Sequence, residues 1–225
     1  MVKEGFPKTV GFRMVAFSLS GVLVNFNNSD NAWDLIRNLY KIPNLWKEYL
    51  EGRMSRYQVK TEEYKLWKAA GVTLNRLMID LRKNTMLFPG VEKLFQELRS
   101  MKVVPAIVSD SPQIVVEDIA NRLGVKYFSS NRILFNKDGF AYETVSSHPS
   151  GDGRVSKLMA LKDFTNRQNI RLSEVIAVGN DREDIEIFKV AGRSIAFNAK
   201  DMETRKAAQI ILNSNNLEDL AEYLK

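Results

Sequence analysis

The side chains that could carry out nucleophilic, acid–base or metal chemistry are few in this chain. It has no cysteine, which excludes disulfides, thiolate catalysis and cysteine-ligated metal sites. Its one histidine, His148, cannot form a histidine-rich metal site alone, and we expect it to have a structural or surface role in its Ser-Ser-His-Pro-Ser loop. What remains is the chemistry of hydroxyl, carboxylate, amide and ammonium groups.

Four short polar segments carry such groups, and three of them directly follow an apolar stretch. The segments are Ser18-Leu19-Ser20, Ser109-Asp110-Ser111, Lys157 in Arg-Val-Ser-Lys-Leu, and Asn180-Asp181 with Asp184. A serine such as Ser18 is a neutral alcohol, so as a nucleophile it would need a base to take its proton. Ser20 cannot be that base.

The apolar run at residues 12–19 predicts a buried strand, and Gly21 indicates a sharp turn after it. In residues 29–86 the apolar residues recur at helical spacing, which predicts several helices that each have an apolar stripe along one face. Trp33 belongs to the first stripe, and Thr73 is the expected N-cap of the last helix. We interpret these stripes as the core of a small helical domain, not as a cofactor site.

From residue 88 onward the pattern alternates between helices and strands. We expect helices near 90–101, 112–123, 155–168, 182–191 and 215–224, and strands near 103–109, 125–128, 174–179, 194–197 and 209–212. Residues 131–146 predict a hairpin that turns at Asp138-Gly139. This alternation predicts an α/β fold, a Rossmann-like parallel sheet with helices on both faces. A helical cap is inserted after the first strand, so we expect a core domain of residues 1–28 and 87–225 and a cap domain of residues 29–86.

The order of these segments resembles the haloacid dehalogenase superfamily, in its phosphoserine-phosphatase-like branch. The first motif of that family is an apolar strand ending Asp-x-Asp-Gly-(Thr/Val)-Leu, and residues 15–24 here read Val-Ala-Phe-Ser-Leu-Ser-Gly-Val-Leu-Val. The frame matches except that Ser18 and Ser20 stand at the two aspartate positions. The second motif, a strand ending in Ser or Thr, matches at Ser109.

The other two motifs follow in the expected order. Lys157 comes just after the hairpin, where that branch has its lysine. The fourth motif, Gly-Asp-x-x-x-Asp, reads Gly-Asn-Asp-Arg-Glu-Asp at residues 179–184, so Asn180 replaces the first acid and Asp184 keeps the second. The resemblance covers nearly the whole chain.

The resemblance implies a role for each motif. In the family the first aspartate attacks phosphorus, and the second protonates the leaving oxygen and then activates water. A magnesium ion lies between the first aspartate, the fourth-motif acids and the phosphate. The serine and the lysine hold phosphate oxygens, which here implies Ser109 and Lys157, with Asp110 beside them.

The exchanged acids predict a loss of this chemistry. Without the nucleophile the rate falls by roughly 10⁶, so we expect no significant hydrolysis of phosphate monoesters, and whether the chain is an enzyme stays open. Magnesium at Asn180, Asp184 and Asp181 is expected to be weakly bound or absent. Binding of phosphate or a small phosphorylated molecule is retained in this interpretation. In phosphoserine-specific members an early cap acid holds the substrate's ammonium, and the nearest residue here is Asn27.

Three alternatives remain open. The chain could be an active magnesium-dependent phosphatase that uses Asp110, Asp181 or Asp184 instead. It could be a protein-interaction scaffold with no ligand, its protein partner unknown. The serines could also be deliberate substitutions in an active parent enzyme.

Composition limits the partners. The net charge is +6, but the basic residues are spread along the chain beside acids, so no nucleic-acid binding is expected. No apolar run is long enough to span a bilayer, so no membrane association is expected. The start of the chain has no apolar signal-peptide segment, which predicts a cytoplasmic protein.

Overall fold

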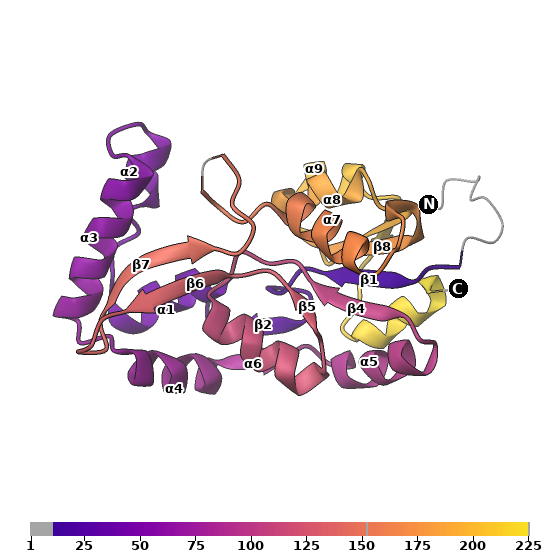
Figure 1. The fold of residues 1–225 in the computed structure, drawn as a ribbon, viewed down its shortest axis with the longest axis horizontal. Coiled ribbons are helices and arrows are strands. Elements are labelled where there is room, and N and C mark those ends of the chain that lie inside the picture. The colour runs from indigo at the N-terminus through magenta and orange to yellow at the C-terminus, as the bar shows by residue number, and fades with distance from the viewer. Residues whose placement is uncertain (1–10, 152, 225) are drawn as a thin grey trace.

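A six-stranded parallel sheet forms the centre of the computed structural model, which describes residues 11–151 and 153–224 (Figure 1). The strand order is β10-β9-β8-β1-β4-β5, and every neighbouring pair is parallel. The strands are β1 (Met14–Phe17), β4 (Val104–Ile107), β5 (Tyr127–Phe128), β8 (Val175–Gly179), β9 (Arg193–Phe197) and β10 (Ile210–Leu212). The predicted α/β class is confirmed.

Strand β1 is buried on both faces, which explains its continuous apolar sequence. Val15 and Phe17 belong to one hydrophobic cluster, and Met14 and Ala16 belong to a second cluster on the opposite face. The first cluster includes side chains of α5 (Val91–Ser100), α6 (Gln113–Leu123) and the 3₁₀-helix η3 (Leu217–Tyr223). The second includes side chains of α7 (Lys157–Arg167) and α8 (Ile185–Phe188), with α9 (Met202–Ala207) nearby (Figure 1).

Four helices lie between the first and second strands of this sheet, as predicted: α1 (Ala32–Tyr40), α2 (Trp46–Leu50), α3 (Arg56–Ala69) and α4 (Leu74–Asn84). The side chain of Thr73 caps α4 by accepting from the amide of Arg76. The chain enters and leaves this insertion through an antiparallel ribbon of β2 (Val24–Phe26) and β3 (Thr85–Leu87), which the sequence pattern did not predict.

The predicted hairpin is confirmed as β6 (Asn131–Phe135) and β7 (Ala141–Ser146). Gly139 has the positive φ of 80° that its turn requires. The hairpin extends from the sheet toward α3, where the hydroxyls of Tyr64 and Thr144 share a hydrogen bond (Figure 1). The hairpin therefore ties the inserted helices to the rest of the chain.

Two predicted helices near the C-terminus were wrong in type. Residues 182–191 form a 3₁₀ turn, η2 (Arg182–Asp184), followed by the short α8, and the last helix is the 3₁₀-helix η3. One further 3₁₀ turn, η1 (Leu172–Glu174), precedes β8. After α8 the chain passes close to η1, because Gly192 packs directly against the backbone of Ser173, where a Cβ would overlap.

Two remaining expectations concern the ends and the membrane. Residues 1–10, which carried the expectation of no signal peptide and begin the expected core domain, lie outside the described residues. Among the helices of the described chain, none has the length and apolarity needed to span a bilayer.

Candidate functional site

The loop after β1 places two serines at the carboxyl edge of the sheet. The amide of Ser18 donates to the carbonyl of Val178 at 2.8 Å, which ties the loop to β8. Ser18 is buried and Ser20 is partly exposed. Gly21 has a φ of 72°, and a Cβ there would overlap Nδ2 of Asn180. Only glycine therefore allows the first loop to turn this close to the fourth-motif segment.

The loop after β4 is held by a ring of buried serine hydrogen bonds. The amide of Ser109 donates to Oγ of Ser129 at 2.8 Å, and that hydroxyl donates back to the carbonyl of Ser109 at 3.1 Å. The amide of Ser111 donates to Oγ of Ser109 at 3.0 Å. Ser109 and its hydroxyl are thus fixed in one orientation at the edge of the sheet.

Asp110 connects this loop to the inserted helices. Its carbonyl accepts hydrogen bonds from Nε1 of Trp33 at 3.1 Å and from Nδ2 of Asn131. Burial raises the pKa of the Asp110 carboxyl, and the Lys157 ammonium opposes the rise. An insertion helix and the hairpin therefore both contact the second-motif loop.

Lys157 lies at the centre of the site as the first residue of α7. Its Nζ donates to Oδ1 of Asp184 at 2.7 Å and to Oγ of Ser18 at 3.3 Å, and it lies 3.8 Å from Oδ1 of Asp181. Burial alone would lower the pKa of Lys157, but Asp184, Asp181 and Glu183 outweigh it and raise the pKa above its ordinary value. Lys157 is therefore a permanent cation and cannot serve as a base for Ser18.

Asp184 is fully buried, and both of its carboxylate oxygens are engaged. Oδ1 accepts from Lys157, while Oδ2 accepts from the amides of Asn180 at 2.9 Å and Asp181 at 3.2 Å. Burial raises the pKa of Asp184, and the Lys157 ammonium opposes the rise. A Cβ on Gly179 would overlap the Asp184 carboxyl, so glycine at this position makes room for it.

The predicted residues converge on one cavity of about 700 Å³. Of the eight residues predicted for the site, all except Asp184 line it; Asp184 lies beneath Lys157. Desolvation raises the pKa of Glu183, at the same cavity, to about 7, and the neighbouring Asp110 carboxylate adds to the rise. The side-chain Oδ1 of Asn180 is buried with no hydrogen-bond partner.

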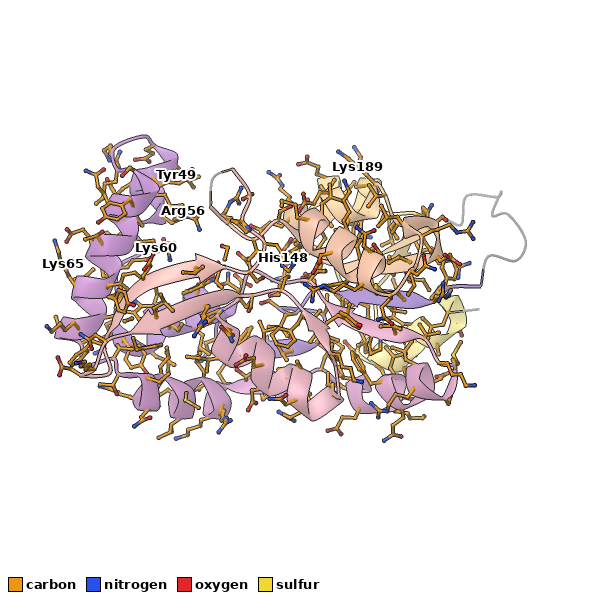
Figure 2. The ribbon with its side chains drawn as sticks, in the orientation of Figure 1. Tyr49, Arg56, Lys60, Lys65, His148 and Lys189 are labelled. Carbon is orange, nitrogen blue, oxygen red and sulfur yellow. The ribbon has the colours of Figure 1, made fainter. Side chains whose placement is uncertain are left out.

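His148, labelled in Figure 2, is not among the residues that line this cavity. Its Nε2 lies 3.3 Å from Oδ2 of Asp163, its Nδ1 lies 3.0 Å from Oγ of Ser147, and its ring packs edge-on against Phe164. It is therefore not positioned to take a proton from Ser18.

The inserted helices contribute a wall of the cavity that the sequence analysis missed. Trp33 was predicted as small-domain core, yet it lines the cavity together with Arg37, Lys60 and Glu63. A signal was present, because Lys60 and Glu63 lie one helical turn apart and so share a helix face with opposite charges.

Comparison with known proteins supports the resemblance. A family model described as haloacid dehalogenase-like hydrolase matches residues 150–224. Phosphoserine phosphatase of Methanocaldococcus jannaschii is 26% identical over 95% of this chain and 98% of its own length. That of Polaromonas sp. is 24% identical over 97% of this chain and 92% of its own. Over nearly its whole length the chain is thus similar to haloacid dehalogenase-like hydrolases of the phosphoserine phosphatase branch.

Solved structures agree on the fold of this branch. A structure described as a phospho-aspartyl intermediate analogue of phosphoserine phosphatase superposes with a TM-score of 0.77, at 24% identity over 96% of this chain and all of that chain. A substrate-bound phosphoserine phosphatase complex gives 0.72. The haloacid dehalogenase-like sheet and its helical insertion are thus shared across almost the full length.

Phosphatases of this family typically depend on magnesium, but the donors of this member do not fit a resident magnesium ion. Both oxygens of Asp184 are already engaged, Asn180 offers a neutral amide oxygen, and Ser18 offers an alcohol. Within the described residues, no three Asp, Glu, His or Cys side chains are grouped so that they could hold a metal. Magnesium prefers carboxylate oxygens, and the most buried carboxylate of the site, that of Asp184, is paired with Lys157.

Proposed function

We propose that this chain binds a phosphate monoester in the cavity and does not hydrolyse it at a significant rate. The observation that carries the proposal is the environment of Ser18. Its neutral hydroxyl accepts from the protonated Lys157, and His148, the one histidine of the chain, is engaged with Asp163. An alcohol beside a permanent ammonium lacks the base that nucleophilic attack requires.

The donors for a phosphate group are supplied by three elements. Ser109 offers a hydroxyl from the loop after β4, and Lys157 offers an ammonium from α7. The loop after Ser18 offers its backbone amides. Because Ser109 and Lys157 are each fixed by hydrogen bonds, we expect little loss of side-chain entropy when phosphate binds.

We propose that Ser18 and Ser20 occupy the positions of the family's two catalytic aspartates and Asn180 that of its metal-binding acid. Residues 29–86 act as a cap domain over a core of residues 1–28 and 87–225. Phosphoserine is a poor candidate ligand, because Asn27 is exposed, donates to Asn84 at 3.0 Å and is not part of the cavity lining.

An active phosphatase using a different carboxylate is less well supported. Asp184 is fully buried, with both oxygens bonded to donors, so it has no oxygen free to attack phosphorus. Asp110 has a raised pKa, so a larger share of it is in the protonated, non-nucleophilic form.

Isothermal titration with inorganic phosphate tests the binding half of this proposal. We expect Lys157→Met and Ser109→Ala each to weaken phosphate binding by at least tenfold. Lys162→Met, on the exposed side of the same helix, is the matched control and should bind as the unaltered chain does. If the unaltered chain shows no phosphate binding, or if both site variants bind as it does, the proposal is wrong.

A further inference from the structure

The cavity is larger than a phosphate group requires. At about 700 Å³ it has room for roughly twenty water-sized groups, whereas the donors at Ser18, Ser109 and Lys157 are matched to a single phosphate. The remaining space extends to the wall formed by α1 and α3. The side chains of that wall must set which organic group the phosphate carries.

The charged side chains on this wall are held in pairs. Glu63 is buried, and its Oε2 accepts from Nζ of Lys60 at 2.8 Å. Its Oε1 lies 3.8 Å from Arg37, which also pairs with Asp34 at 2.5 Å. Arg56, which also lines the cavity from α3, has a partner as well, so each charged side chain that α1 and α3 contribute to the lining is partnered. An organic group with its own carboxylate or ammonium, as in an amino-acid phosphate, would meet no uncompensated partner here.

The same wall still offers hydrogen bonds. The distance of 3.8 Å leaves Oε1 of Glu63 without a close donor, so it can accept from a ligand. Lys60 has three N–H donors and uses one on Glu63. Its Nζ lies 4.6 Å from the ring centre of Trp33, which supplies an apolar surface beside these polar groups. In Figure 2, Lys60 lies on the side of α3 toward the hairpin and Lys65 on the outer side.

We infer that the ligand is the phosphate ester of a neutral polyhydroxylated group, a sugar or polyol phosphate. Adjacent hydroxyls each donate and accept, so one can donate to Glu63 while its neighbour accepts from Lys60. The C–H face of such a group packs on Trp33. This inference rests on the proposed phosphate site and adds the identity of the organic group.

Titration calorimetry with five probes tests it: inorganic phosphate, O-phosphoserine, glucose 6-phosphate, ribose 5-phosphate and glycerol 3-phosphate. At least one of the three polyol phosphates should bind ten times more tightly than inorganic phosphate and than phosphoserine. Glu63→Gln and Lys60→Met should reduce that preference at least fivefold without changing the affinity for inorganic phosphate. Their exposed neighbours Glu62→Gln and Lys65→Met should leave the preference intact.

The outcomes separate the two proposals. Binding of inorganic phosphate with no gain for any polyol phosphate, or a tighter fit for phosphoserine, would overturn the inference and leave the phosphate site standing. Loss of inorganic phosphate binding in both Glu63→Gln and Lys60→Met would also overturn it. These side chains would then be needed to bind the phosphate itself, not only the organic group. No binding of any probe would overturn both proposals.

Discussion

The ammonium of Lys157 lies 2.7 Å from Oδ1 of Asp184, and both side chains are buried where the loops after β1 and β8 meet α7. A buried pair of this kind is costly to break, because the remaining charge keeps its desolvation penalty and loses its partner.

Removing the cation should therefore destabilise the fold. We expect Lys157→Met to lower the free energy of unfolding by about 3–5 kcal/mol, measured by urea denaturation. Combining it with Asp184→Asn should give a smaller loss than Lys157→Met alone, because no uncompensated charge then remains. A loss below about 1 kcal/mol for the single variant would show that the pair is not an important electrostatic contact.

The close packing of Gly179 on Asp184 gives a second prediction. Gly179→Ala places a methyl group where the Asp184 carboxyl lies. We therefore expect the free energy of unfolding to fall by at least about 1–3 kcal/mol and phosphate binding to weaken. Gly151→Ala is the control, because its Cβ would meet nothing within 4 Å, and it should change stability by less than about 0.5 kcal/mol. Equal effects in the two variants would contradict this packing.

Anion binding should depend on pH through Glu183. Its pKa of about 7 lies above the ordinary value of 4.5, so raising the pH from 6 to 8 adds a negative charge at the cavity. Sulfate, which stays a dianion over this range, should therefore bind more tightly at pH 6 than at pH 8. Glu183→Gln should flatten the dependence, whereas Glu203→Gln, at an exposed site, should leave it unchanged. A flat profile in the unaltered chain would refute the role of Glu183.

Magnesium should contribute little. Because Asp184 is engaged by Lys157 and two amides, we expect millimolar Mg²⁺ to leave the melting temperature and the phosphate affinity unchanged. The variant with Ser18→Asp and Asn180→Asp should gain a magnesium-dependent increase in melting temperature, since it regains two carboxylates. A comparable magnesium-dependent increase in the melting temperature of the unaltered chain would contradict this prediction, because it would show that the side chains present are enough to bind magnesium.

The fold and the convergence of the motif residues could be predicted from sequence because both depend on local patterns. The apolar run at β1 and the alternation of helices and strands specify a parallel sheet, and the motif residues follow strands or begin a helix. The β2–β3 ribbon escaped prediction because its three-residue strands carry too short a pattern. The 3₁₀-helices η2 and η3 escaped prediction because apolar spacing over such short segments does not distinguish a 3₁₀-helix from an α-helix.

The wall that α1 and α3 contribute to the cavity could not be predicted, because it depends on contacts between distant segments. Trp33 donates to the carbonyl of Asp110, a residue 77 positions later in the chain. Arg37 approaches Glu63 from another helix. Helical spacing places such residues on one face, but which face meets the cavity follows only from how the helices pack on the hairpin.

On the function proposed above, Ser18 cannot act as the nucleophile of phosphoryl transfer. The most direct test is the release of phosphate from p-nitrophenyl phosphate with magnesium by the purified chain, compared with the triple variant Ser18→Asp, Ser20→Asp and Asn180→Asp. We predict no turnover above background for the unaltered chain, in line with a loss of roughly 10⁶ in rate, and measurable turnover for the triple variant. Robust magnesium-dependent turnover by the unaltered chain would contradict the account.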